Sequence, residues 1–151
     1  APWHSVELYY LNLLNCTHTG GWVNSNGSCT GRGSNGHAPL KLSSGISTCA
    51  TRPWARYLAV NGLLEHYGPT GPGDRLRACG YTSPWWGENL GQWDGDPYTG
   101  AIKVVQFFQS EKASNGGHWR NLMSTNFHSI GVGIWVSGGR AIYNTDFYGP
   151  G

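Results

Sequence analysis

The most regular pattern along the chain is a helical repeat of apolar residues between Thr99 and Lys112. Apolar side chains recur there every three or four positions, a spacing that gathers them on one face of an α-helix. The members of this face are Ile102, Val104, Val105, Phe107 and Phe108. We therefore predict a helix over 99–112.

A second pattern, near the C-terminus, has a period of two. Ile130, Val132, Ile134 and Val136 alternate with Gly131, Gly133 and Trp135. This alternation predicts a strand with one apolar face and one mostly small face. Two glycines in the segment from Ser137 to Arg140 predict a hairpin turn, and Ala141 to Phe147 is then the return strand. Because helices precede this antiparallel hairpin, the fold class is α+β.

Weaker patterns predict two further helices, both in the first half of the chain. Ser5 can cap a helix from Val6 to about Leu14, with Leu8 and Leu11 on its apolar face. A second helix begins near Pro53, which suits a first helical turn, and its apolar stripe extends to the segment that contains His66.

The middle of the chain gives less regular signals. A short helical piece is predicted from Asp74 to Ala78, after a turn rich in glycine and proline. The segment from Tyr81 to Pro97 is aromatic and is predicted to be irregular. The pattern shows no internal repeat and no second domain, so we expect one domain over 1–151.

Four cysteines, an even number without a C-x-x-C motif, favour two disulfides over a zinc cluster or a redox motif. Three connectivities are possible. We favour Cys16–Cys29 with Cys49–Cys79, because the first bridge would close a polar stretch that can bury little. The residues from 16 to about 37, rich in Gly, Ser and Asn, are then a pinned loop. Disulfides imply an oxidising compartment.

Composition excludes two classes of protein. The net charge is only +2 and the basic residues are scattered, which argues against binding nucleic acid through a basic patch. No apolar stretch approaches the ~20 residues of a membrane helix.

The first residues, Ala1-Pro2-Trp3, include neither a Met nor a signal-like segment, as expected for a mature secreted protein.

Four residues are candidates for chemistry: His66, Glu88, Glu111 and His118. Glu111 follows Phe107 and Phe108 by four and three positions, so its carboxylate leaves the helix near the apolar face. Each residue also has a simple structural explanation, such as a solvated helix-end Glu or a His at a helix terminus. No pair has the spacing of H-E-x-x-H, so local sequence alone does not define a metal site.

Read in order, these residues lie within motifs of a known family. The motifs are Leu63-Leu64-Glu65-His66, Gly87-Glu88-Asn89-Leu90, Gln109-Ser110-Glu111-Lys112, Gly117-His118-Trp119-Arg120-Asn121 and Ile130-Gly131-Val132-Gly133. From about Ser5 to Phe147 the chain resembles the CAP superfamily, which includes cysteine-rich secretory proteins, insect venom antigen 5 and plant pathogenesis-related class 1 proteins. It is similar to the compact, bacterial-like form with an extracellular SCP-like domain.

The resemblance implies a three-layer α-β-α sandwich with a mainly antiparallel central sheet. It also implies a cleft in which His66, Glu88, Glu111 and His118 hold a divalent metal, with Zn²⁺ the best match to imidazoles and carboxylates. Asn121 would support this cleft rather than line it. Two departures from the family are the pinned loop and the lack of a cysteine-rich tail.

Three functions agree with this reading. We favour a secreted, monomeric binding module that engages a lipid, glycan or protein. Trp85, Trp86, Trp93 and Tyr98 could form its surface, although core packing is the more common role of such residues, since Trp is usually highly buried. The alternative is a metal-dependent, peptidase-like hydrolase with a zinc-activated water and Glu88 or Glu111 as base. A serine mechanism would need Ser110 or Ser129 beside His118. Third, the four residues could form a structural cluster that holds no metal.

Overall fold

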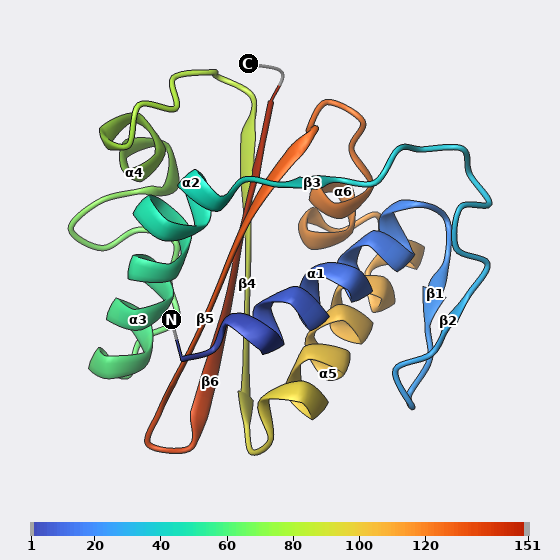
Figure 1. Ribbon diagram of the computed structural model, residues 1–151, viewed down its shortest axis with the longest axis horizontal. Helices are drawn as coiled ribbons and strands as arrows, with labels where there is room; N and C mark the ends of the chain where they lie inside the picture. The colour runs from blue at the N-terminus through green and yellow to red at the C-terminus, as the bar shows by residue number, and fades with distance from the viewer. Residues whose placement is uncertain (1, 150–151) are drawn as a thin grey trace.

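The computed structural model describes residues 2–149 and places a four-stranded sheet between two helical layers (Figure 1). One layer contains α2 (Ser44–Ile46), the π-helical turn η1 (Ser47–Thr51), α3 (Arg52–Asn61) and α4 (Pro72–Ala78). The other contains α1 (His4–His18), α5 (Pro97–Ser110) and α6 (Gly117–Met123), with the short 3₁₀ turn η2 (Lys112–Ser114) between the last two. The expected α-β-α sandwich is confirmed.

The central sheet has the strand order β3-β5-β6-β4. Its strands are β3 (Lys41–Leu42), β4 (Trp86–Asp94), β5 (Ser129–Ser137) and β6 (Arg140–Tyr148). Only the two-residue β3 runs parallel to its neighbour, so the sheet is mixed but mainly antiparallel, as expected. Gly138 and Gly139 form the β5–β6 turn with φ of 59° and 78°, the left-handed values that a two-residue type I′ turn requires.

The small face of β5 has a packing reason. A Cβ atom on Gly133 would lie 2.5 Å from the Cα of Arg52, at the start of α3. Glycine therefore lets the helix approach the backbone of the strand closely. The alternation of apolar and small residues follows from the two different layers that β5 contacts.

The structure corrects the prediction for the segment from Tyr81 to Pro97. Instead of being irregular throughout, it contains the nine-residue β4, paired with β6 from Trp86↔Tyr148 to Asp94↔Arg140. Two glycines lower the strand propensity of this segment, but pairing with β6 and packing against α5 override it. A Cβ on Gly91 would lie 2.5 Å from Val104 of α5, which shows how closely the helix packs.

Two helix predictions also need correction. Helix α1 continues to His18 rather than ending near Leu14, and Leu8 is 44% exposed because the buried face contains other residues. Those buried residues include Val6, Tyr10, Leu13 and Leu14. Helix α3 ends at Asn61, where Gly62 adopts the left-handed conformation typical of a helix C-terminus. His66 therefore lies outside the helix, in the segment that leads to α4.

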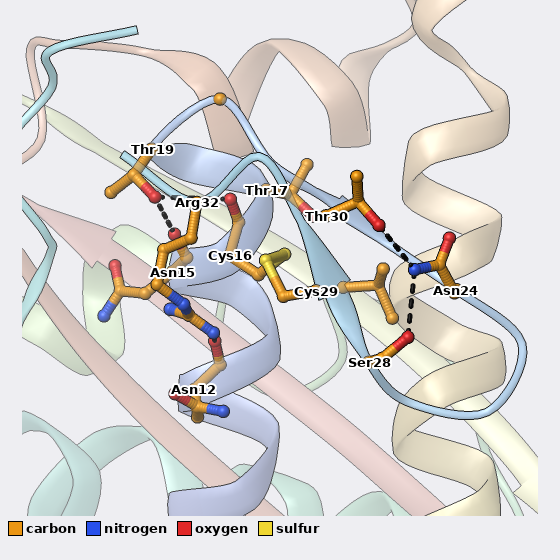
Figure 2. The surroundings of a disulfide bond; sticks show 12 residues. Asn12, Asn15, Cys16, Thr17, Thr19, Asn24, Ser28, Cys29, Thr30 and Arg32 are labelled. Atoms are coloured by element: carbon orange, nitrogen blue, oxygen red, sulfur yellow. Dashed lines mark hydrogen bonds between the residues drawn. A yellow bond between two sulfur atoms is a disulfide. The ribbon is translucent and has the colours of Figure 1, made fainter. Parts of the chain in front are cut away.

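Both expected disulfides, Cys16–Cys29 and Cys49–Cys79, are confirmed. The first joins α1 to a small hairpin, β1 (Trp22–Val23) and β2 (Cys29–Thr30), within the loop that was expected to be irregular (Figure 2). Across this hairpin, the side-chain amide of Asn24 donates to the Oγ of Ser28 at 3.0 Å and to the Oγ1 of Thr30 at 2.9 Å. The bonds brace the hairpin internally, and the bridge holds it against the end of α1.

The four aromatic residues considered as a ligand surface do not form one. Trp86 and Trp93 are partly buried and pack against two different core clusters. Trp85 and Tyr98 are exposed, but they flank opposite ends of β4. Within residues 2–149, no helix is long and apolar enough to span a bilayer.

Candidate functional site

The four candidate residues line one cavity of about 530 Å³. The cavity lies over β4, the edge strand of the sheet, and is bounded by α6 on one side and by the segment between α3 and α4 on the other. Its walls contain His66, Glu88, Asn89, Glu111, His118 and Asn121, with Ser114, Gly116 and Gly117 at the turn before α6. The fold thus brings together residues from four separate segments.

The first pair of side chains is Glu111 with His118. Glu111 follows the last residue of α5, and His118 is the second residue of α6. One carboxylate oxygen accepts the backbone N–H of His118 at 3.0 Å, and the other lies 2.7 Å from Nδ1 of the same residue. Both oxygens of Glu111 are therefore held by His118.

A glycine and an aromatic ring fix this pair. Gly116 passes so close to Glu111 that a Cβ atom there would overlap the carboxylate. On the other side, the His118 ring stacks on Phe108 with centroids 5.0 Å apart and planes 15° apart. The ring is consequently restrained by packing as well as by hydrogen bonding.

The second pair is Glu88 with His66. Nδ1 of His66 lies 2.9 Å from Oε1 of Glu88, whose side chain is only 1% exposed. The carboxylate also accepts two hydrogen bonds from Nη2 of Arg75, at 3.2 and 3.0 Å. Arg75 comes from α4 and its guanidinium stacks over Trp54 at 3.7 Å. The Arg75 side chain is thus the counterion of this buried carboxylate.

A further carboxyl group, Asp146, lies behind Glu88. The two residues are paired across β4 and β6, and Asp146 is fully buried. Its Oδ2 accepts from the Thr51 hydroxyl at 2.9 Å. Burial, and next the nearby charge of Glu88, raise the pKa of Asp146 well above its ordinary value of 3.8. A proton shared between the two carboxyl groups relieves their repulsion.

The other pKa values in the site differ between the two pairs. Burial raises the pKa of Glu88, although Asp146 and Arg75 act in the opposite direction. Partial burial also acts to raise the pKa of Glu111, but the hydrogen bonds and charge of His118 outweigh it and lower that pKa. Burial, followed by the charge of Arg75, lowers the pKa of His66 and so favours its neutral form.

Two asparagines connect the walls of the cavity. Nδ2 of Asn89 donates to the backbone carbonyl of His118 at 3.0 Å, and Nδ2 of Asn121 donates to Oδ1 of Asn89 at 3.0 Å. Asn89 follows Glu88 on the strand, so their side chains point to opposite faces of the sheet. Asn121 both supports the cleft and lines it, which corrects the expectation that it would only support it.

This geometry fixes how the histidines can react. A carboxylate only accepts, so Nδ1 of each ring carries a proton, and in the neutral ring Nε2 keeps its lone pair. A histidine whose Nδ1–H is held by a carboxylate is a common arrangement among metal ligands. Between residues 2 and 149, however, no three or more His, Cys, Asp or Glu side chains are grouped so that they could hold a metal ion.

Sequence reasoning missed Arg75 and Asp146. Arg75 gave no signal, because it lies in a short helix with another arginine nearby. Asp146 was recognisable as a charged residue within a predicted strand, a position that is unusual without a partner. The two serines considered for a serine mechanism are engaged elsewhere: Ser110 donates to the Phe107 carbonyl, and Ser129 lines cavities away from the cleft.

The fold and the site together define an α-β-α sandwich with paired imidazoles and carboxylates in a cleft over the sheet edge. A family model described as the cysteine-rich secretory protein family, CAP, matches residues 30–145, and the chain belongs to this family. No curated protein sequence matches the chain significantly.

Solved structures agree with this assignment. An extracellular protein with an SCP domain from Bacillus anthracis str. Ames has a TM-score of 0.70 at 17% identity, over 97% of this chain and 41% of its own. NaASP2, crystallised with Zn²⁺, has a TM-score of 0.61 at 11% identity, and the match covers 94% of this chain and 78% of NaASP2. A cysteine-rich secretory protein from Staphylococcus aureus subsp. aureus Mu50 has a TM-score of 0.59 at 14% identity, and the match covers 95% of this chain and 38% of that protein. The chain spans about two fifths of the Bacillus protein, and these identities establish the fold alone.

Proposed function

We propose that this CAP domain is a secreted binding module whose cleft holds one divalent metal ion, preferentially Zn²⁺. The observation that carries the proposal is the pair of Nδ1–carboxylate contacts, His66 with Glu88 and His118 with Glu111, on the walls of one cavity. The surface around the cleft would engage a lipid, glycan or protein ligand. The two disulfides support an oxidising, extracellular location.

The chemistry of the two imidazoles suits the metal, although residues 2–149 do not group three ligating side chains around one point. In the proposed site, Nε2 of His66 and Nε2 of His118 are the ligands, and Glu88 and Glu111 hold the rings in the tautomer that metal binding requires. Imidazole nitrogens suit Zn²⁺, and a shell with few protein ligands leaves positions that a partner molecule can occupy. The bound ion would supply a Lewis-acidic anchor for an oxygen or nitrogen atom of that partner. NaASP2, a similar fold, was crystallised with Zn²⁺.

The alternative is a metal-dependent hydrolase with Glu88 or Glu111 as general base. A base must present a free lone pair to the proton that it removes. Each oxygen of both carboxylates already accepts at least one hydrogen bond, from His66 and Arg75 or from His118. Both carboxylates therefore already orient an imidazole, and this role supports the binding module over the hydrolase.

The test is calorimetric titration of Zn²⁺ into chelator-stripped protein, for the wild type and for the His66→Ala/His118→Ala double variant. We expect the double variant to lose one saturable binding event that the wild type has. His4→Ala is the matched control, because His4 is exposed and lies on α1, away from the cleft. Equal titrations of the wild type and the double variant would refute the metal site and leave a structural cluster.

Hydrolysis is tested separately, on the zinc-loaded wild type with peptide and ester substrates. The proposal expects no turnover above that of the double variant. If the wild type turns over a substrate, and Glu88→Gln or Glu111→Gln abolishes this turnover while zinc stays bound, the protein is a hydrolase rather than a binding module.

A further inference from the structure

A second pair of histidines lies away from the cleft, at the base of the β1–β2 hairpin. His18 is the last residue of α1, and His37 lies in the segment that leads to β3. Their ring centroids are 5.7 Å apart and the ring planes differ by 48°. Both rings line a cavity of about 580 Å³, together with His128 and Lys41. The pair is formed by the loop that departs from the expected family pattern.

The His18 ring is buried and has a defined tautomer. The residue is 3% exposed, and its Nδ1 lies 2.8 Å from the backbone carbonyl of Leu122 in α6. Because a carbonyl oxygen can only accept, Nδ1 carries a proton, and in the neutral ring Nε2 keeps its lone pair. No residue in the described part of the chain forms a hydrogen bond with this Nε2. A metal-binding histidine commonly donates its other N–H to a backbone carbonyl in this way.

The second ring is brought into place by Asn35. Its Nδ2 donates to the backbone carbonyl of His18 at 3.0 Å, and its Oδ1 accepts the backbone N–H of His37 at 2.9 Å. One amide side chain therefore joins the backbones of both histidines. Nδ1 of His37 is buried and has no hydrogen-bond partner among residues 2–149. A buried polar atom without a protein partner is costly, and a bound ion is one way to satisfy it.

The loop that carries His37 is restrained at several points. The Cys16–Cys29 disulfide joins it to the last turn of α1, two residues before His18 (Figure 2). Thr19 adds a hydrogen bond from its hydroxyl to the Asn15 carbonyl at 2.7 Å, and its backbone carbonyl accepts from Asn35 at 3.2 Å. The two rings are thus held on a braced loop and a helix end, as a preorganised site requires.

We propose that His18 and His37 together bind one divalent transition-metal ion of the kind that prefers imidazole, such as Zn²⁺ or Cu²⁺. Metal–nitrogen bonds of about 2.0–2.1 Å place the centroids of two imidazoles on one tetrahedral ion about 5 Å apart, close to the observed 5.7 Å. Solvent or a partner molecule fills the other positions. This site is independent of the cleft between His66 and His118.

The geometry favours a cation over an anion. With Nδ1–H of His18 committed to Leu122, the ring presents an acceptor to the cavity, and an acceptor binds a metal rather than a phosphate. Lys41 is the one positively charged side chain among the described lining residues and is exposed. An anion held by Lys41 is therefore the alternative that the experiment has to distinguish.

Binding would have a structural consequence for the loop. His18 lies near the start of the loop and His37 at its end, so one ion would join its two ends. The constraint resembles that of the neighbouring disulfide, which also joins α1 to the hairpin. Metal binding should therefore slow the opening of residues 19–36, which hydrogen exchange measures.

The experiment uses the His66→Ala/His118→Ala variant as background, so that the cleft does not contribute. Calorimetric titration with Zn²⁺ should show one remaining equivalent. His37→Ala in that background should weaken it by more than about 100-fold, since even the loss of an outer partner costs 10–100-fold. His37 is only partly buried, so this change should leave the fold intact. His128→Ala is the matched control, a histidine of the same cavity outside the ring pair, and should keep the affinity.

Hydrogen exchange gives a second readout. In the same background, Zn²⁺ should protect amides within residues 19–36, and His37→Ala should abolish that protection. Equal zinc affinity with and without His37→Ala would overturn the proposal. Loss of zinc binding in His128→Ala would also overturn it. A third contrary result would be no binding of Zn²⁺ together with binding of inorganic phosphate that Lys41→Ala removes.

Discussion

The two His–Glu pairs of the cleft have the same contact but are built in different ways. Glu111 and His118 are seven residues apart, just after the end of α5 and in the first turn of α6. Glu88 and His66 come from a strand and from the segment between α3 and α4. The Glu111 side chain is 19% exposed, whereas that of Glu88 is 1% exposed. One pair is thus local and partly solvated, and the other is assembled by the tertiary fold.

The difference shows what each carboxylate requires. Glu111 needs only the His118 backbone N–H and ring, together with water. Glu88 loses its hydration, so it needs the guanidinium of Arg75, and it lies beside another buried carboxyl, Asp146. Identical ring geometry in the cleft therefore rests on local hydrogen bonds in one pair and on a buried charge network in the other.

The largest expected effect comes from removing Arg75. Arg75→Ala would leave Glu88 and Asp146 buried without their counterion and would also remove the guanidinium that donates to the His66 carbonyl. Breaking a buried ion pair in this way costs about 3–5 kcal/mol. Urea denaturation should show this decrease in the free energy of unfolding.

Arg77→Ala is the matched control, because Arg77 lies on the same helix but pairs with Asp74 in solvent, with side chains 57% and 59% exposed. An exposed pair of this kind contributes about 0–1 kcal/mol. If the two arginine variants had equal stability, Arg75 would not be the counterion that the buried pair needs, and the contrast between the pairs would fail.

A smaller effect is expected in the local pair. Gly116→Ala would place a methyl group against the Glu111 carboxylate, and overpacking of this kind costs about 1–3 kcal/mol. The displaced carboxylate should also lower the zinc affinity of the cleft by about 10–100-fold. Both changes are measured by thermal unfolding and by calorimetric titration.

The adjacent glycine provides the control for that substitution. A Cβ atom on Gly117 would meet only the guanidinium of Arg120, at 3.8 Å, so Gly117→Ala should change neither stability nor zinc affinity appreciably. Similar losses in both variants would mean that helix flexibility, rather than the position of Glu111, explains the effect.

The same contrast explains what could be predicted from the sequence. The β5–β6 hairpin, helix α5 and both disulfides followed from periodicity, turn glycines and cysteine spacing, since these signals are local. Helix α3 was extended too far because an apolar stripe continues past Gly62, whose left-handed conformation ends the helix. Strand β4 was missed because its conformation depends on pairing with β6.

The candidate site shows more clearly which features local sequence signals cannot predict. The fold does bring His66, Glu88, Glu111 and His118 to one cavity, but their selection came from ordered motifs that resemble a family. Arg75 and Asp146 lie outside those motifs, and only the three-dimensional arrangement shows them beside Glu88. Charge networks of this kind depend on burial and on cross-strand pairing, which periodicity does not specify.

The smallest expected effect concerns the pH dependence of the buried pair. The pKa of Asp146 is raised above its ordinary value of 3.8 by burial and by Glu88. A raised folded-state pKa gives stability that is fully present below that ordinary value and is lost as the pH rises through the folded-state pKa. The fold therefore weakens as the pH rises above about 4, because the unfolded chain ionises Asp146 while the folded protein keeps the proton.

Asp146→Asn removes this dependence with little change in shape. The amide oxygen can still accept from Thr51, and the amide nitrogen can donate to Glu88, so the shared proton is no longer needed. The stability of the variant relative to the wild type should therefore increase between pH 4.5 and 8, as followed by thermal unfolding at each pH. Parallel curves for the two proteins would show that folding does not raise the pKa of Asp146 and that the two His–Glu pairs differ in burial alone.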